Sequence, residues 1–322
     1  MSLLTQASLV LTPTSYKANK LYSVVPSSGN GDITTTRATT ATRVNSTGLV
    51  ENVATGIPRV DYTGGVANIL LEPQRTNLLL NSATVVTQTI STTGVACTVS
   101  FFGTGTITFS GSFSGSLVGT GASNRVSLIF TPTAGSLVLT VSGTCTNGQL
   151  ETGSYATSYI PTTTSTVTRN ADLMTLNNIY TNGLITSAGG TWFVELNNNV
   201  VLLRDIFNFG LFLNTLNNGL GNGFNIRNGS SNTRFRIHKT ILGSDTELFL
   251  TTTDIVKMVI KWNGVTADLF VNGIKIVSAT SFNTTNMEFL NGGARDVPKY
   301  IKSMMLFPTP LTDTECANLT TL

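Results

Sequence analysis

Charged side chains are scarce in this chain of 322 residues. They make up 11% of the sequence, against roughly 25% in ordinary soluble domains. The formal net charge is only +3, and no run of lysine and arginine interleaved with aromatic residues occurs. Both absences argue against a groove that binds nucleic acid.

Cysteine, histidine and long apolar runs are also scarce. The three cysteines, Cys97, Cys145 and Cys316, are too few for a disulfide framework. We expect buried, reduced thiols, although Cys97 and Cys145 could pair within one domain. The one histidine, His238, lacks the neighbours of a metal site or triad and alternates with basic residues, as on the solvent face of an edge strand. We expect neither a signal peptide nor a membrane helix.

What is abundant is threonine, with serine, glycine and asparagine, in a chain that is 40% hydrophobic. Threonine favours strands, and glycine and asparagine favour turns, so we predict an all-β protein. Between Thr76 and Thr168 the only charged residues are Arg125 and Glu151. Short apolar runs separated by turn residues, such as ACTVSFF and GSLVLTVSG, predict a β-sandwich there. Its uncharged surface suits subunit packing or neutral-glycan contact, with a merely solvated threonine surface as the alternative.

From Leu173 onward the charge rises and the strands lengthen. Asn272-Gly273 between two alternating apolar runs predicts a hairpin. Near the C-terminus, Thr312 followed by Glu315 forms a capping box, and Leu311 is placed to staple the first turn of a short helix. Together with Trp262-Asn-Gly, these pieces resemble the laminin G-like and concanavalin A-like jelly roll. The resemblance implies two antiparallel sheets over residues 173 to 322.

The segment from Arg37 to Asn77 contains four arginines among Thr, Asn, Gly and Pro. A planar guanidinium makes several bonds at once and suits ion pairs and backbone carbonyls. We expect these arginines to act in structure and assembly, with three nearby acids as partners, and the sequence leaves open whether they join loops of one subunit or different subunits. The set comprises Arg37, Arg43, Arg59, Arg75, Glu51, Asp61 and Glu72.

The sequence of this segment resembles those of virion fibre and appendage proteins of tailed phages, including crAss-like phages of Bacteroidetes. The matching stretches are ASLVLTPTSYKANKLYSVVP, RATTATRVNSTGLVENV, IPRVDYTGG and LLEPQRTNLLLNS, with GQLETGSYATSYIPT as a second signature. The resemblance implies a homotrimeric fibre or spike, assembled in the host cytoplasm and carried on the virion. Its N-terminal region would attach it to other virion proteins, and the sequence leaves open whether these belong to the capsid or to the tail.

We accordingly expect three parts: an N-terminal irregular and β anchor region over residues 1–82, a charge-poor sandwich over 83–172, and a jelly roll over 173–322. The expected function is that of a non-enzymatic virion structural protein that contacts host-surface glycans. The alternatives are a polysaccharide depolymerase and a purely architectural capsid decoration protein. We expect no cofactor, no nucleic-acid partner and no membrane insertion.

Candidate residues for chemistry are few. A glycoside hydrolase needs two carboxylates about 5–5.5 Å apart if it retains configuration, and the nearest pair is Asp245 and Glu247, which a solvated strand edge explains better. Glu195 stands alone on its strand, and no loop spaces calcium ligands convincingly. We expect no catalytic or metal-binding residue. Aromatic residues that could stack on a glycan are Trp192, Trp262, Tyr155 and Tyr159, although both tryptophans lie in apolar-alternating runs typical of a core.

Overall fold

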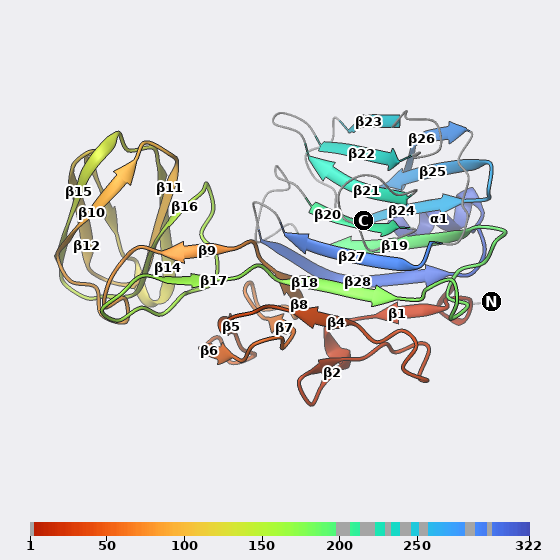
Figure 1. Ribbon diagram of the computed structural model, residues 1–322, viewed down its shortest axis with the longest axis horizontal. Coiled ribbons are helices and arrows are strands. Elements are labelled where there is room, and N and C mark those ends of the chain that lie inside the picture. The colour runs from red at the N-terminus through yellow and green to blue at the C-terminus, as the bar shows by residue number, and fades with distance from the viewer. Residues whose placement is uncertain are drawn as a thin grey trace.

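In the part of the chain that it describes, the computed structural model contains two β-sandwiches and one short α-helix, so the prediction of an all-β protein with a terminal helix is confirmed (Figure 1). Every strand pair in the described part of the chain is antiparallel. The structure describes residues 3–197, 207–212, 223–228, 233–238, 246–250, 257–280, 287–294 and 298–322.

The larger sandwich consists of two sheets. In chain order, the first contains β1 (Leu9–Leu11), β7 (Arg59–Asp61), β8 (Asn68–Leu71), β19 (Gly190–Leu196), β24 (Lys257–Trp262), β25 (Thr266–Val271), β26 (Ile274–Thr280) and β28 (Lys299–Phe307). The second contains β4 (Thr34–Thr36), β18 (Leu173–Asn177), β20 (Phe207–Phe212), β21 (Gly223–Asn228), β22 (Thr233–His238), β23 (Thr246–Leu250) and β27 (Phe289–Ala294). β22 lies between β21 and β23. The expectation that His238 is on an edge strand is therefore wrong.

Strands from the N-terminal region complete both of these sheets. β1 pairs with β28 so that Leu9 lies opposite Leu306, and β8 pairs with the other end of β28. β4 pairs with β18 in the second sheet. The expected boundaries at residues 82 and 172 therefore differ from the strand pairing. The N-terminal region is built into the jelly roll rather than forming a separate anchor.

Apolar side chains of the larger sandwich form two clusters. Between the sheets, Trp192 and Trp262 are each 1% exposed. On the outer face of the first sheet, Phe193 and Phe270 pack in one cluster with residues of the C-terminal helix α1 (Asp313–Thr320). The capping box at the start of α1 is present, as predicted. The helix thereby covers an apolar face that would otherwise be exposed to water.

The predicted hydrophobic staple of this helix and the predicted hairpin next to it are both present. Leu311 and Cys316 belong to the same buried cluster, as a hydrophobic staple requires. Asn272 and Gly273 both have positive φ angles, 47° and 86°, and they connect β25 to β26 in the predicted hairpin.

The smaller sandwich is formed by residues between Gln88 and Thr152. One of its sheets contains β10 (Gln88–Thr93), β12 (Thr106–Gly111), β13 (Gly115–Val118) and β15 (Ala134–Ser142). The other contains β11 (Cys97–Gly103), β14 (Gly121–Phe130) and β16 (Cys145–Thr152). Cys97 and Cys145 are buried free thiols in its core, and burial raises the pKa of both.

The smaller sandwich is an insertion in the larger one. The chain leaves through β9 (Arg75–Asn77) and returns through β17 (Val167–Arg169), and these two strands pair with each other between the two sandwiches (Figure 1). The remaining elements of the described residues are the hairpins β2–β3 (Tyr16–Lys17 and Lys20–Leu21) and β5–β6 (Ala41–Val44 and Val50–Val53) and the 3-10 turns η1 (Leu3–Thr5) and η2 (Pro13–Ser15).

Candidate functional site

The two segments that carry the phage-fibre resemblance meet beside the β9–β17 connection. There, guanidinium and carboxylate groups form a buried ionic cluster, which we call the joint. Its charged members come from residues 37 to 72 and from residues 169 to 172, and every one of their side chains is at most 1% exposed. The joint consists of Arg37, Arg59, Glu72, Arg169 and Asp172.

Asp172 is the acceptor that connects two of the arginines. One of its oxygens accepts from Arg37 at 2.7 Å, and the other accepts from Arg59. The backbone N–H of Glu72 also donates to Asp172, at 2.8 Å. Arg37 also donates hydrogen bonds to the backbone carbonyls of Ala54 and Ile57, at 2.6 and 3.2 Å. One guanidinium thus fixes a loop that has no regular secondary structure of its own.

Glu72 is the second acceptor of the joint. Its Oε2 lies 2.6 Å from Arg59 and 2.8 Å from Arg169, and the backbone and hydroxyl of Ser158 donate to its two oxygens at 2.6 Å each. Burial would raise the pKa of Glu72, but the charges of Arg169 and Arg59 and the Ser158 bonds outweigh it and lower the pKa to about 2. Glu72 is therefore ionised at neutral pH and holds three separate segments together.

A second group of polar side chains extends the joint onto the smaller sandwich. Glu151 accepts from the backbone and hydroxyl of Thr157, each at 2.7 Å, and its Oε2 lies 3.9 Å from Arg75. Burial raises the pKa of Glu151 despite these bonds. Gly153 has a φ of +121°, and a Cβ there would lie 2.9 Å from Arg75 Nη2. A glycine at this position therefore lets the guanidinium lie against the backbone.

The arginine partners found differ in part from those expected. Arg43 forms an ion pair with Glu51 at 2.6 Å on the surface. Arg59, however, pairs with Glu72 and Asp172 rather than with Asp61. Asp61 is buried and accepts from the backbone N–H groups of Val44 and Thr63, at 2.7 and 2.8 Å. It therefore shapes a turn.

Three residues of this region were not singled out as site residues from the sequence: Arg169, Asp172 and Tyr300. Arg169 and Asp172 lie in the words TVTRNAD, which repeat the Thr-Arg pairing of the first signature. This repeated Thr-Arg pattern is a sequence signal for Arg169. It does not indicate which residues pair, because Arg59 and Asp172 are 113 positions apart. Tyr300 lies on β28 and carries no local sequence signal.

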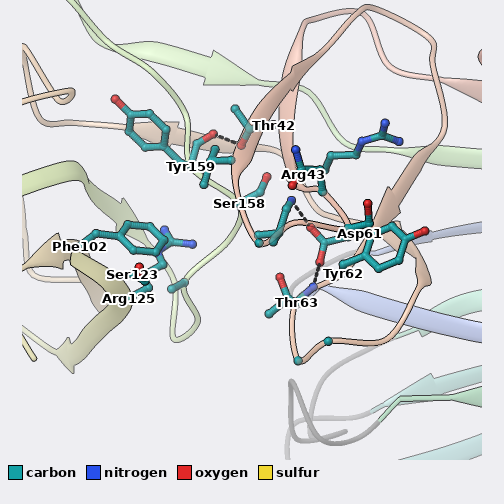
Figure 2. Close-up of a pocket in the computed structure, with 18 of the residues that line it drawn as sticks. Thr42, Arg43, Asp61, Tyr62, Thr63, Phe102, Ser123, Arg125, Ser158 and Tyr159 are labelled. Carbon is teal, nitrogen blue, oxygen red and sulfur yellow. Dashed lines mark hydrogen bonds between the residues drawn. The ribbon is translucent and has the colours of Figure 1, made fainter. Parts of the chain in front are cut away.

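A cavity of about 680 Å³ lies next to the joint, between the two sandwiches. Figure 2 shows Phe102, Ser123 and Arg125 of the smaller sandwich on one side and Asp61, Tyr62 and Thr63 on the other. Arg125 donates to the carbonyl of Thr157 at 2.6 Å and to the hydroxyl of Ser100 at 2.8 Å. Four aromatic residues line this cavity: Tyr62, Phe102 and Tyr300, which are partly buried, and Tyr159.

The aromatic candidates for glycan contact are placed differently. Trp192 and Trp262 are in the core of the larger sandwich, which removes both from the set of exposed stacking platforms. Tyr159 is 6% exposed, exchanges a hydrogen bond with Ser82 at 2.8 Å, and lines the cavity. Tyr155 is partly buried.

The candidates for catalysis gain no support from the described residues. Asp245 lies outside the described part of the chain, and of Glu247 only the backbone is described. Glu195 lies 3.5 Å from Lys302 and accepts from Ser303 at 3.3 Å. Among the described residues, no group of three His, Cys, Asp or Glu side chains is arranged to hold a metal ion. Within the same residues, no helix is long and apolar enough to cross a membrane.

No family model and no curated protein sequence matches this chain. Solved structures give distant likenesses. The carbohydrate-binding module of the Ruminococcus gnavus IT-sialidase, bound to α2,3-sialyllactose, is 15% identical, covers 42% of this chain and 83% of its own, and has a TM-score of 0.33.

Two further likenesses are of the same strength. A mutant of the NanB sialidase of Streptococcus pneumoniae is 15% identical over 43% of this chain and 25% of its own, with a TM-score of 0.33. The receptor-binding domain of a botulinum neurotoxin of mosaic serotype C/D is 15% identical over 46% and 38%, also with a TM-score of 0.33. The chain thus spans about a quarter of the length of that sialidase. Similarity this remote carries no functional argument.

Proposed function

We propose that this chain is a non-enzymatic structural protein of a phage particle, displayed as a homotrimeric fibre or spike that adheres to saccharides. The observation that supports the proposal most is the joint. The two segments that resemble phage fibre proteins meet there, because Glu72 of the first accepts from the backbone and hydroxyl of Ser158 of the second. Glu72 also pairs with Arg169, which follows the second segment. In this account, the sequence that both segments share with phage fibre proteins has a structural role: it fixes the angle between the two sandwiches.

The surface of the smaller sandwich favours association with further copies. Between residues 78 and 166 the only charged residues are Arg125 and Glu151. The side chain of Glu151 is fully buried and Arg125 is bonded to Thr157, so neither presents a free charge outward. Exposed apolar residues such as Val118 and Ile129, 57% and 54% exposed, lie on this surface instead. Depletion of charge with retained apolar area is typical of interface cores.

Attachment to the particle would use the parts of the N-terminal region that project from the larger sandwich. Hairpins β2–β3 and β5–β6 extend from its lower edge (Figure 1), and both have exposed residues, such as Lys17 and Asn52. The strands β1, β4, β7 and β8 are committed to the sheets. An attachment site built from the hairpins would leave the jelly roll intact.

The test combines mass with location. Native mass spectrometry of the full chain should give about three times 34.1 kDa, and gold-labelled antibody should decorate phage particles that carry the protein. Ile129→Lys places a charge on the surface of the smaller sandwich and should shift the mass toward the monomer. Leu49→Lys, at a residue 65% exposed outside that surface, serves as the matched control. A monomeric wild-type protein absent from particles would refute the proposal.

A further inference from the structure

The cavity between the two sandwiches has walls from several distant parts of the chain. Phe102 and Ser123 come from β11 and β14, and Tyr62 follows β7 (Figure 2). Tyr300 comes from β28. Its volume of about 680 Å³ falls within the range of about 300–1,000 Å³ that is usual for small-molecule sites, which are frequent at domain junctions. Exposed lining residues such as Ser123 and Gly64 give it a mouth open to solvent.

The polar groups of the cavity keep unused hydrogen-bonding capacity. Each oxygen of Asp61 accepts one backbone N–H, although a carboxylate oxygen has two lone pairs. Arg125 makes two hydrogen bonds from a guanidinium that has five N–H groups, and its buried Nε has no hydrogen-bond partner. Burial and the nearby charge of Asp61 raise the pKa of Tyr300, so its phenol remains a donor.

These groups decide between classes of ligand. A purely apolar ligand would leave the remaining hydrogen-bonding capacity of Asp61 and Arg125 unsatisfied. A phosphate or another strong anion would meet the buried carboxylate of Asp61, and the positive charge of Arg43 is already paired with Glu51. A sugar ring offers an apolar C–H face and a rim of hydroxyl groups that both donate and accept. That combination matches aromatic walls interleaved with a carboxylate, a guanidinium and exposed amides.

We propose that this cavity binds a short neutral saccharide, with Phe102 and Tyr62 as ring contacts and Asp61, Arg125 and Asn124 as hydrogen-bonding groups. This inference rests on the adhesive part of the proposed function. It moves the saccharide site from the displayed jelly roll to the junction beside the joint. The ionic joint then has a second consequence, because it holds the two walls of the site at a fixed separation.

The test uses the full chain with four neutral probes: maltotriose, cellotriose, N-acetylchitotriose and N-acetyllactosamine. Saturation-transfer difference NMR should detect binding of at least one probe. The affinity should remain unchanged within error between 50 and 500 mM salt, the behaviour expected without charge–charge attraction. Phe102→Ala should weaken binding about tenfold, as expected for the loss of an aromatic contact. Tyr22→Ala, at an aromatic residue outside the cavity that is 37% exposed, should have no effect.

A blocking variant keeps the test independent of folding defects. Ser123 is exposed at the mouth of the cavity, so Ser123→Tyr should abolish binding while leaving the unfolding midpoint unchanged. Binding that survives Ser123→Tyr, or no signal from any of the four probes in the folded wild type, would overturn the inference. Either result leaves the native mass and particle labelling intact, so failure of this site is distinguishable from failure of the proposed fibre role.

Discussion

At the residue scale, the joint concentrates buried charge in a chain that has little charge elsewhere. Three guanidinium groups face two carboxylates, and the surplus positive charge is offset by backbone carbonyls such as those of Ala54 and Pro73, each 2.6 Å from its arginine. Removing one partner from such a cluster leaves buried charge uncompensated, which costs far more than losing a surface pair.

Glu72→Gln tests this contrast directly. We expect the free energy of unfolding to fall by about 3–5 kcal/mol, because Arg59 and Arg169 lose their shared carboxylate in a buried site. Glu51→Gln is the matched control, since it breaks the exposed pair with Arg43 and should cost less than about 1 kcal/mol. Urea unfolding measures both values. Equal costs for the two variants would contradict the account of the joint.

The pH dependence of stability follows from the same carboxylate. The pKa of Glu72 is about 2 in the folded protein against a reference value of 4.5, so its contribution is fully present above pH 4.5. That contribution is lost as the pH falls from about 4.5 toward about 2, and amounts to on the order of 3 kcal/mol. Wild type and Glu72→Gln should therefore converge in stability as the pH falls through this window. Parallel curves would be the contrary result.

At the element scale, the sequence predicted those structures whose signals are local. The strands of the smaller sandwich, the Asn272-Gly273 hairpin and the capped helix α1 each depend on residues within a few positions of one another. Pairings such as Leu9 with Leu306 or Met174 with Thr35 join distant segments, and nothing in a single segment specifies its partner. For the same reason the sequence indicated a structural role for Arg37 and Arg59 but did not identify Asp172 or Arg169 as members of the joint.

The strand pairing predicts which parts of the chain fold alone. Residues 173 to 322 expressed by themselves should remain unfolded by circular dichroism and NMR, because they lack β1, β8 and β4. Replacing residues 78–166 with a two-residue turn should instead leave the larger sandwich folded, since Asn77 and Val167 are already paired. A folded 173–322 fragment would show that the N-terminal strands are dispensable.

At the scale of the whole molecule, the joint is the feature that makes two sandwiches into one body. The smaller sandwich has its own core and is connected by only two short strands, β9 and β17 (Figure 1). A two-strand connection alone would permit bending. Ser158, Thr157 and Arg125 connect that sandwich to the ionic cluster, and they also border the cavity proposed to bind a saccharide. Rigidity and binding therefore depend on the same side chains.

Hydrogen–deuterium exchange of wild type and Glu72→Gln tests this claim most directly. Peptides covering residues 54–72 and residues 156–172 should be protected in the wild type and should lose protection together in the variant. The peptide covering residues 97–103, in the core of the smaller sandwich, should keep its protection. If protection is lost only in the peptide that contains Glu72, while residues 156–172 exchange as in the wild type, the joint does not couple the two segments and the account is contradicted.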